Sequence, residues 1–285
     1  MNDEINFLIV GLGLLGGSYA EGLSKKGYKV FGVDINQDSI DYAISKGWIT
    51  EGVTDVTQEF LKDKNVIIFC LYPHTMIEWL NTYQSWLMPG SIITDVTGVK
   101  QYVYDELNKF LRKDIEFIGC HPMAGKEVSG IRNSNANIFK NANYLIINND
   151  NSKKATDVAL LIGKELEFKN ISFLGIKEHD EMIGFLSQLT HCIAISLMTC
   201  KESKRLVEYT GDSFRDLTRI AKINEDMWSE LFILNKEELL KQMDIFLVQF
   251  NSLKEAIKNE NIELMKDIMR LSTKNRSYFD KKESD

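Results

Sequence analysis

The sequence predicts two domains in succession, an α/β domain over residues 1–175 and an all-α domain over residues 176–285. The first half alternates short β-branched apolar runs with amphipathic segments, which is typical of a parallel sheet flanked by helices. The second half contains no proline and has long stretches with helical periodicity. A length of 285 residues suits two domains or one large domain.

Seven apolar runs in the first half are expected to be strands, and most of them are hydrophobic on both faces. Burial beneath helices on both sides requires this composition, because every second residue of a half-solvated strand would be polar. The expected strands are residues 5–11, 29–34, 65–71, 91–96, 115–120, 143–148 and 171–175.

The first helix expected in the second half spans roughly residues 178–202 and is apolar nearly all round. A helix of this kind is normally buried on every side. Because a domain of only 110 residues can hardly bury a central helix alone, we expect a second subunit to complete its burial. Residues 226–253 and 257–273 predict more ordinary amphipathic helices.

Composition and charge favour an enzyme that acts on a small molecule. Apolar residues make up 44% of the chain and charged residues 26%, as in soluble globular proteins. The net charge of −7 lacks the basic excess of a nucleic-acid binder. The N-terminus is acidic where a signal peptide would be basic, and no apolar run approaches the roughly 20 residues of a membrane span. We therefore expect a cytoplasmic protein that binds neither nucleic acid nor membrane.

The four cysteines show no spacing typical of metal ligands. None lies in a CxxC pair, and three of them fall inside apolar runs. A free thiol in such a run usually behaves as a small buried hydrophobe, so neither a metal site nor a disulfide framework is indicated.

The strongest local motif is GLGLLG at residues 11–16, which follows the first expected strand and opens an expected helix. Its first glycine permits a tight turn, its second lets the backbone approach a pyrophosphate, and its third allows close contact between helix and strand. The helix N-terminus faces the anion. The candidate cofactor-binding residues of this turn are Gly11, Gly13, Leu14, Leu15 and Gly16.

An acidic residue follows the second expected strand at the distance this motif predicts. Asp34 lies 18 residues after Gly16, where a carboxylate can accept hydrogen bonds from both hydroxyls of a ribose. The same carboxylate would repel a 2′-phosphate, and Ile35 and Asn36 after it carry no positive charge. The sequence therefore predicts a Rossmann-type nucleotide-binding domain that prefers NAD to NADP. A glycine turn in an α/β domain without cofactor is the alternative.

Two of the four histidines are candidates for catalysis. His121 directly follows the strand expected at residues 115–120, at the carboxyl end of the sheet, where open α/β sheets bind ligands. A structural role explains its position equally well. His191 lies inside the apolar helix, where a lone polar residue is more often a hydrogen-bonded core histidine. His179 is expected to cap that helix or be solvated, and His74 to lie in a loop.

Arg215 and Arg219 are four residues apart and therefore share one helix face. Without other motifs nearby, this pattern would indicate a row of exposed charged side chains on the helix surface that includes Asp216, a charge ladder. The segment does not stand alone, because it lies in a series of motifs that point to one family.

Five segments of the chain form this series, namely GLGLLGGS, DVTGVK, CHPMAGKEVSG, SQLTH and FRDLTRIA followed by Met227 and Trp228. Taken together, they resemble the prephenate and arogenate dehydrogenases of tyrosine biosynthesis. The glycine motif is generic, but the other segments are specific in this order, and the match covers nearly the whole chain. The resemblance implies a nucleotide-binding domain followed by a helical domain through which two subunits dimerise, with the active site between them.

The resemblance also implies an activity, the NAD-dependent oxidative decarboxylation of prephenate to 4-hydroxyphenylpyruvate. Removing the C4 hydroxyl proton and passing the C4 hydride to NAD⁺ creates a vinylogous β-keto acid, which loses CO₂ because the ring becomes aromatic. His121 matches the family's base, a task that suits a near-neutral imidazole. Arg219 matches the arginine that holds a substrate carboxylate, and His191 matches the second histidine of the active site.

The sequence departs from the family pattern at two positions. Gly98 stands where many relatives carry a serine that hydrogen-bonds the base and the substrate hydroxyl. We expect Thr97 to supply this hydroxyl instead, with an ordered water as the alternative. Thr190 replaces the usual proline before the second histidine. Because no chorismate mutase or regulatory amino-acid-binding segment is recognised, we expect the minimal, monofunctional form.

Three other functions remain as alternatives. An arogenate dehydrogenase would form tyrosine directly, and its substrate differs from prephenate only in an amino group that replaces a keto group. A β-hydroxyacid dehydrogenase or imine reductase would usually carry a lysine in the helical domain, whereas the apolar helix has none between Lys177 and Lys201. A noncatalytic nucleotide-sensing module would need neither a base nor a carboxylate clamp.

Overall fold

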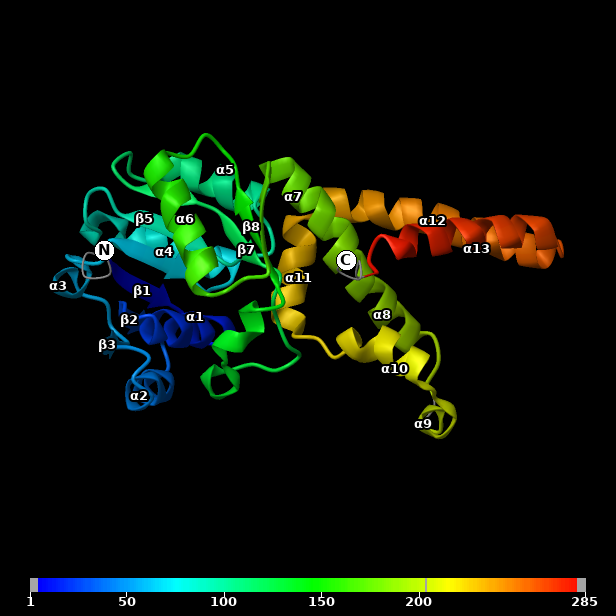
Figure 1. Ribbon diagram of the computed structural model, residues 1–285, viewed down its shortest axis with the longest axis horizontal. Helices are drawn as coiled ribbons and strands as arrows, with labels where there is room; N and C mark the ends of the chain where they lie inside the picture. Colours follow the sequence, from blue (N-terminus) through cyan, green and yellow to red (C-terminus); the bar gives the residue numbers. More distant parts are fainter. Residues whose placement is uncertain (1–4, 203, 281–285) are drawn as a thin grey trace, which may run out of the picture. The chain divides into compact units, whose positions relative to one another are not determined.

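The computed structural model describes residues 5–202 and 204–280 of the chain (Figure 1). The chain divides into two compact units, Met1–Asn235 and Lys236–Asp285. The first unit contains the α/β half and the helices up to Asn235, and the second contains two long helices. Continuous helical structure begins at Ile176, so the change of architecture expected from the sequence occurs within the first unit.

Six parallel strands form the main sheet, in the order β3-β2-β1-β4-β5-β6. Because β1 lies between β2 and β4, the strand order reverses there, and a crevice is expected at the carboxyl ends of β1 and β4. The expected parallel sheet is confirmed, although β3 escaped prediction because it is short and carries Glu51 and Gly52. The bounds are β1 (Asn6–Val10), β2 (Lys29–Val33), β3 (Glu51–Val53), β4 (Val66–Phe69), β5 (Ile92–Asp95) and β6 (Glu116–Ile118).

Both faces of this sheet are buried, as the composition of its strands predicts. In β1, Phe7 and Ile9 belong to one apolar cluster, and Leu8 and Val10 belong to another. Alternate side chains therefore point to opposite faces, each of which is covered by helices. These helices are α1 (Leu14–Lys25), α2 (Gln37–Ser45), α3 (Gln58–Leu61), α4 (Pro73–Tyr83), α5 (Gln101–Phe110) and α6 (Lys153–Glu165).

A second sheet of three strands was not expected. It consists of β7 (Cys120–Pro122), β8 (Asn143–Ile147) and β9 (Asn170–Leu174), with β7 antiparallel to β8. The strand expected at residues 115–120 is therefore divided at Gly119, whose N–H donates to the Tyr104 hydroxyl and whose carbonyl accepts from β8. His121 lies within β7 rather than after a strand, and pairs with Leu145.

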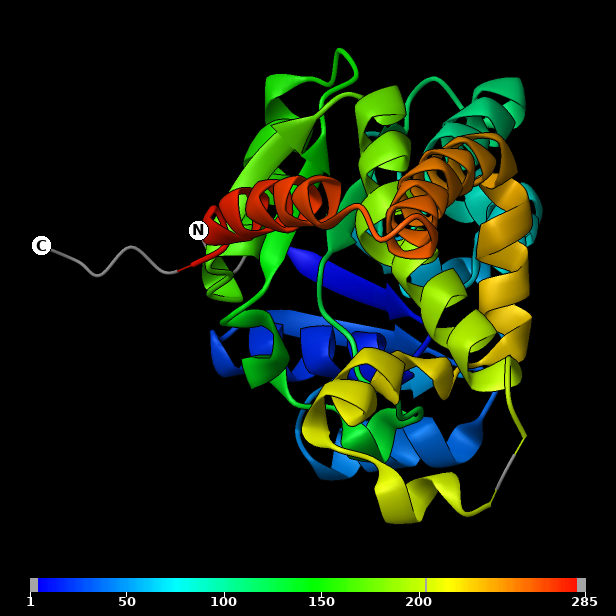
Figure 2. The same cartoon turned by 90° about the vertical axis from the view of Figure 1, so that its right-hand side faces the viewer.

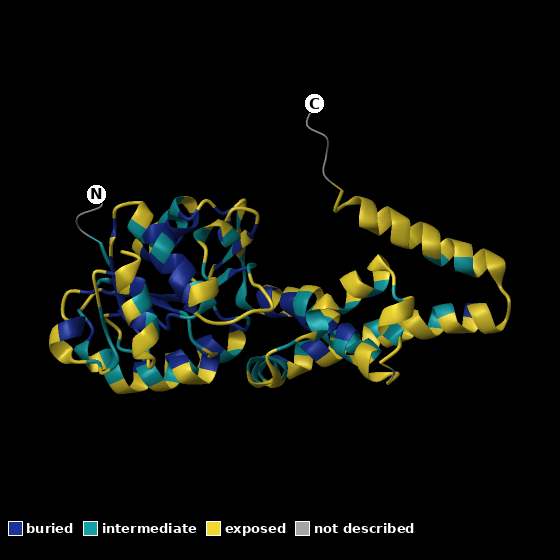
Figure 3. Cartoon of the chain, turned by 90° about the horizontal axis from the view of Figure 1, so that it is seen from below, coloured by how far each residue is buried: buried dark blue, intermediate teal, exposed yellow. Residues whose placement is uncertain are grey.

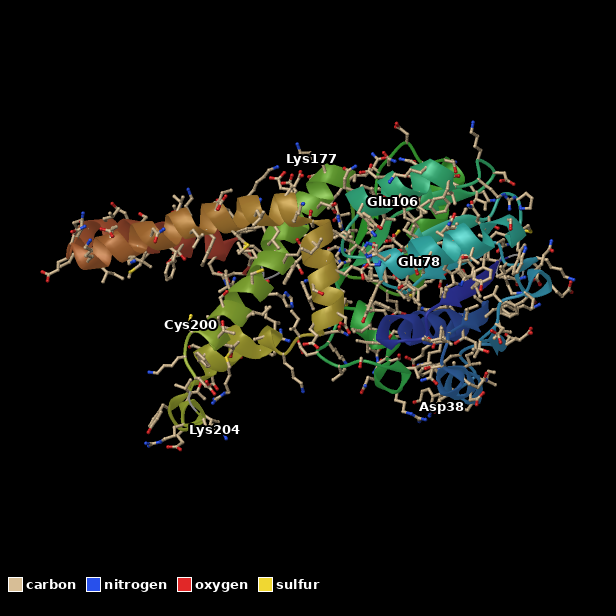
Figure 4. The ribbon with its side chains drawn as sticks, turned by 180° about the vertical axis from the view of Figure 1, so that it is seen from behind. Asp38, Glu78, Glu106, Lys177, Cys200 and Lys204 are labelled. Carbon is tan, nitrogen blue, oxygen red and sulfur yellow. The ribbon has the colours of Figure 1, made fainter. Side chains whose placement is uncertain are left out.

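The apolar helix spans Ile176–Thr199, close to the expected 178–202. Lys177 and Cys200 mark its two ends in Figure 4. It is not buried on every side within one chain, because Phe185 and Leu186 are each about half exposed, at 50% and 49%. Its segments are α7 (Ile176–Ile183), the π-helical turn η5 (Gly184–Leu189) and α8 (Thr190–Thr199).

This helix also corrects the expectation that no segment is long enough to span a membrane. By length and composition alone it could cross a bilayer, with a mean hydropathy of 1.4. Its polar residues, such as Gln188 and His191, interrupt the apolar run without lowering that mean far. A core helix of a soluble protein passes the same test. Residues 1–4, whose acidic side chains weigh against a signal peptide, lie outside the described residues.

The remaining helices do not follow the expected boundaries. The helix expected at 226–253 is broken at Asn235, whose buried amide donates to the Asp180 carbonyl at 2.9 Å and to Gln188 Oε1 at 2.8 Å. In the second unit, α12 and α13 are mostly exposed and appear largely yellow in Figure 3. These elements are α9 (Leu206–Tyr209), α10 (Asp212–Thr218), the 3-10 turn η6 (Arg219–Ala221), α11 (Glu225–Leu234), α12 (Lys236–Lys258) and α13 (Ile262–Ser277).

Candidate active site

A cavity of about 710 Å³ opens at the carboxyl ends of β1, β4 and β5. Segments that directly follow these strands line one side, and residues of η5, α8 and α11 line the other. The crevice expected from the strand order is therefore present, and helices line part of it. The predicted site residues among its lining are Gly13, Leu14, Leu15, Thr97, Gly98, His121 and His191.

The glycine turn has the geometry that the motif predicts. Gly11 has a φ of +94°, which favours glycine, and its N–H donates to the Val33 carbonyl at 2.8 Å. A Cβ on Gly16 would lie 1.8 Å from the Gly11 carbonyl oxygen, so only glycine allows α1 to pack this closely on the turn. A Cβ on Gly13 would instead meet no described atom within 4 Å, because this residue faces open space.

The N-terminus of α1 is suited to bind an anion. Its N-cap residue, Gly13, provides no side-chain cap, and its first turn contains no acidic residue. The free N–H groups and the positive end of the helix dipole therefore face the cavity beside Leu14 and Leu15. A pyrophosphate fits this arrangement.

Asp34 follows β2 and is half-buried beside the glycine turn. Its Oδ2 accepts from the Leu12 N–H at 2.6 Å, and its Oδ1 accepts from the Asn36 N–H at 2.8 Å. These bonds fix the carboxylate, and each oxygen retains a lone pair for a ribose hydroxyl. Asp34 does not line the 710 Å³ cavity, as expected for a residue that would meet the distant end of a dinucleotide.

His121 lies at the cavity edge and is linked to a second histidine that sequence reasoning assigned wrongly. His121 Nδ1 lies 2.9 Å from His179 Nε2, and His179 Nδ1 lies 2.7 Å from Asp180 Oδ1. His179 is completely buried, so it is neither solvated nor a simple cap. A histidine in a first helical turn gives no sequence signal for a contact 58 residues away.

The hydrogen bonds fix the tautomers of both rings. Asp180 accepts the Lys100 and Gln101 N–H groups at 2.8 Å each, so its carboxylate can only accept from His179 Nδ1–H. His179 Nε2 is then an acceptor, and His121 must donate from Nδ1. His121 Nε2 consequently keeps a free lone pair, which is what a general base requires.

Both rings are held in the neutral form. Burial, followed by the neighbouring His179 and Lys100, lowers the pKa of His121 well below its usual 6.5. Burial also lowers the pKa of His179, although Asp180 opposes the shift. His121 keeps one edge open to the cavity while protein encloses the rest of its ring. The base is therefore unprotonated at neutral pH.

A buried ion pair lies beneath this histidine pair. Lys100 is wholly buried, and its Nζ lies 2.5 Å from Asp95 Oδ2 and donates to the Cys120 carbonyl at 2.7 Å. Asp95 Oδ1 accepts from the Cys120 N–H at 3.0 Å. The pair thus fixes the residue before His121 from both sides. Sequence reasoning missed both residues, although they belong to the DVTGVK segment, because a lysine after a strand is usually solvated.

The structure does not bring the Thr97 hydroxyl to His121. Thr97 is buried, its hydroxyl is hydrogen-bonded to Asp95, and it also lies 2.9 Å from the Val99 carbonyl. A hydroxyl has one proton to donate, and these two acceptors already compete for it. His179 orients His121 instead, so the expectation that the Thr97 hydroxyl hydrogen-bonds His121 is wrong.

Gly98 faces the site as expected. A Cβ placed on Gly98 would lie 3.8 Å from His121 Cε1 and 3.7 Å from Leu231 Cδ1. These are ordinary van der Waals distances, and the φ of Gly98 is not in the left-handed region. The site therefore has room for a side chain that this sequence does not supply.

His191 lines the cavity from α8. Its Nδ1–H donates to the Ser187 carbonyl at 2.8 Å, and its ring faces Trp228 with centroids 3.7 Å apart. Burial lowers the pKa of His191. Its Nε2 remains available toward the cavity, which supports a binding role over a purely structural one.

Arg219 lies outside the cavity lining. Its side chain is 61% exposed and forms an ion pair with Glu127, which does line the cavity. Arg215 pairs with Asp212 and not with Asp216, so the alternative interpretation of this segment, a charge ladder through Asp216, does not hold. The lining itself carries two other cations, Lys126 and Lys222, which have no acidic partner among the described residues.

Comparison with known proteins gives consistent results for both halves of the chain. The family model "Prephenate dehydrogenase, nucleotide-binding domain" matches residues 19–167, and "Prephenate dehydrogenase, dimerization domain" matches residues 176–271. Prephenate dehydrogenase of Bacillus subtilis is 29% identical over 92% of this chain and 72% of its own. That of Lactococcus lactis is 30% identical over 84% and 67%.

One solved structure shares the fold over nearly the whole chain. It is the prephenate dehydrogenase of Aquifex aeolicus in complex with hydroxyphenyl propionate and NAD⁺. It is 30% identical, covers 97% of this chain and 98% of its own, and has a TM-score of 0.88.

Proposed function

Because the chain belongs to the prephenate dehydrogenase family, we propose that it catalyses the NAD-dependent oxidative decarboxylation of prephenate to 4-hydroxyphenylpyruvate. The product makes this a step of tyrosine biosynthesis. The observation that carries the proposal is a neutral, tautomer-fixed His121 in the same cavity as an anion-binding helix N-terminus. This pairing suits the removal of a hydroxyl proton beside a bound dinucleotide.

The nucleotide would be held by backbone groups and one carboxylate. The N–H groups at Gly13, Leu14 and Leu15 suit the pyrophosphate, and Asp34 suits the adenosine ribose. When bound, NAD⁺ supplies the hydride acceptor. The negative charge of Asp34 disfavours the 2′-phosphate of NADP⁺.

His121 would accept the proton of the substrate's C4 hydroxyl at Nε2. His179 then stabilises the imidazolium by accepting its Nδ1–H, and Asp180 holds His179 in the required tautomer. The space beside Gly98 accommodates the hydroxyl or a water that orients it. Loss of CO₂ makes the ring aromatic and leaves a phenolate oxygen, to which the His121 imidazolium would return the proton from Nε2.

Prephenate carries two carboxylates, and the cavity offers several cations for them. Arg219 would bind one carboxylate after its guanidinium exchanges Glu127 for the substrate. His191 lines the same cavity, and because its Nδ1–H is donated to Ser187, its Nε2 can accept a hydrogen bond from the substrate. Lys222 and Lys126 are the cations that line the cavity directly.

The direct test is NADH formation by the purified protein on addition of prephenate, with arogenate in parallel. We expect NADH release with prephenate, and release roughly 10²-fold slower after His121→Asn. NADH formation with arogenate alone would make the chain an arogenate dehydrogenase. Activity with a β-hydroxyacid, and with neither of these substrates, would assign it to another class of dehydrogenase.

We further infer that residues 176–285 form a substrate-binding and dimerisation domain beside a nucleotide-binding domain over residues 1–175. The half-exposed Phe185 and Leu186 on the apolar helix support a second copy as the cover, as does the match to a dimerization domain. We propose in addition that this homodimer is soluble and cytoplasmic. Sedimentation equilibrium should give twice the chain mass without detergent, and a monomer in water or a need for detergent would contradict it.

A further inference from the structure

The helix α4 starts at the rim of the cavity without an N-terminal cap from its own segment. Its N-cap residue, Tyr72, makes no side-chain cap hydrogen bond, and its first turn contains no acidic residue. The first N–H groups of a helix have no partner inside the helix, and its N-terminus carries partial positive charge. An acceptor from elsewhere in the chain would therefore stabilise α4.

Glu230 of α11 supplies this acceptor. Its Oε1 accepts from the His74 backbone N–H at 2.9 Å and lies 2.8 Å from His74 Nδ1. The Glu230 side chain is only 16% exposed. His74 is thus not a free loop residue but the second residue of α4, and it is held by a residue 156 positions later.

A second hydrogen bond joins the same two segments. Asn224, the N-cap residue of α11, donates from Nδ2 to the Tyr72 hydroxyl at 3.0 Å. In Figures 1 and 2, α11 lies beside the part of the α/β half that carries α4. We call the contacts of Glu230 with His74 and of Asn224 with Tyr72 the α11 latch.

The α11 latch joins opposite walls of the cavity. Tyr72 and Pro73 line it from the β4–α4 side, while Trp228 and Leu231 line it from α11. Trp228 packs on His191, and Leu231 lies beside Gly98. The separation of α4 from α11 therefore sets how tightly these walls enclose a bound molecule.

We propose that Glu230 is a positioning residue that fixes α11 to the N-terminus of α4 and thereby keeps the cavity closed over the bound dinucleotide. Glu230 is not among the residues that line the cavity, so it acts through His74. The choice of dinucleotide rests on the proposed function.

The test uses three variants of the full chain. Glu230→Gln keeps an oxygen acceptor but removes the charge, and Glu230→Ala removes both. Glu225→Ala is the matched control, because Glu225 lies on the same helix, is exposed, and its side chain makes no hydrogen bond or ion pair among the described residues. Fluorescence titration gives the Kd for NADH, and hydrogen exchange reports the amides of Tyr72 and residues 74–76.

We expect Glu230→Ala to raise the Kd for NADH roughly tenfold, the effect of losing one charge-assisted hydrogen bond, and to speed exchange at the amides of Tyr72 and residues 74–76. Glu230→Gln should lie between Glu230→Ala and the wild type, and Glu225→Ala should match the wild type.

Faster exchange with an unchanged Kd would overturn the proposal, since Glu230 would then only cap a helix. Unchanged exchange would overturn it as well. Neither measurement requires turnover of prephenate, so a chain that binds NADH but fails to oxidise prephenate would refute the proposed substrate and leave this test intact. Circular dichroism of each variant identifies any that fails to fold. If Glu230→Ala does not fold, the Kd for NADH and the exchange rates of Glu230→Gln test the proposal alone.

Discussion

His179 does not itself line the cavity, yet its replacement should impair the proton transfer assigned to His121. In His179→Asn, the amide nitrogen can occupy the place of Nδ1 and still donate to Asp180. It cannot reach His121, because asparagine ends where the imidazole ring begins to extend toward Nε2. The substitution therefore removes one hydrogen bond, the 2.9 Å contact between the two rings, and retains the 2.7 Å contact to the carboxylate.

The expected size of the effect follows from what His121 loses. A donor left unsatisfied in a buried position costs about 1–3 kcal/mol. His121 can also adopt the tautomer with its proton on Nε2, in which it is no base toward the cavity. If the whole loss falls on the transition state, kcat decreases about five- to 150-fold. The KM for prephenate should change little, because His179 does not line the cavity.

The assay is steady-state NADH formation with a second variant as control. His179→Gln places an amide oxygen near the position of Nε2, so it should restore part of kcat while losing the contact to Asp180. In a His121→Asn background, His179→Asn should have no further effect, because the two residues act as one unit. A wild-type kcat for His179→Asn, or additive losses in the double variant, would refute the reasoning.

Three other predictions concern the same cavity. Burial, His179 and Lys100 lower the pKa of His121, so protonation should abolish kcat/KM only below pH 6.5, and an acid limb above that value would contradict the assignment. His121→Asn should lower kcat roughly 10²-fold. Arg219→Ala should mainly raise the KM for prephenate, by about tenfold, because the Arg219 side chain is mostly exposed. Identical effects of the two substitutions on kcat and KM would contradict this division of roles. Asp34 should make kcat/KM higher with NAD⁺ than with NADP⁺, and equal values would show that its charge does not select the cofactor.

The sequence predicts well those parts of the fold that depend on local pattern. The runs that become β1, β4 and β5 are apolar on both faces, and only a sheet covered on both sides buries them. The glycine turn is predicted equally well, because the need for glycine at positions 11 and 16 comes from steric contacts within the turn and with its immediate neighbours. Periodicity and local sterics are sufficient at these positions.

Contacts between distant polar residues were beyond such reasoning. His179 and Lys100 look like surface residues in the sequence, yet both are buried. His179 contacts His121 in another segment, and the Lys100 amino group donates to the distant Cys120 carbonyl as well as pairing with Asp95 nearby. The side-chain direction of Thr97 depends on which hydrogen-bond acceptors lie near it after β5 ends. In the structure these acceptors are Asp95 and the Val99 carbonyl. Hydrophobic patterning says which residues are inside, but it does not say which polar group pairs with which.

The π-helical turn Gly184–Leu189 changes how the apolar helix must be read. A π turn holds one more residue than an α turn, so it shifts the helical phase of everything after it by about 100°. A helical wheel that assumes a regular α-helix from Ile176 to Thr199 places the buried face before the turn and the buried face after it at different angles. This is one reason why the segment looks apolar all round in the sequence. The extra residue turns His191 toward Trp228 and the cavity. Deleting a single residue from the turn would restore the α-helical phase, and would rotate His191 away from the site while α7 stays in place.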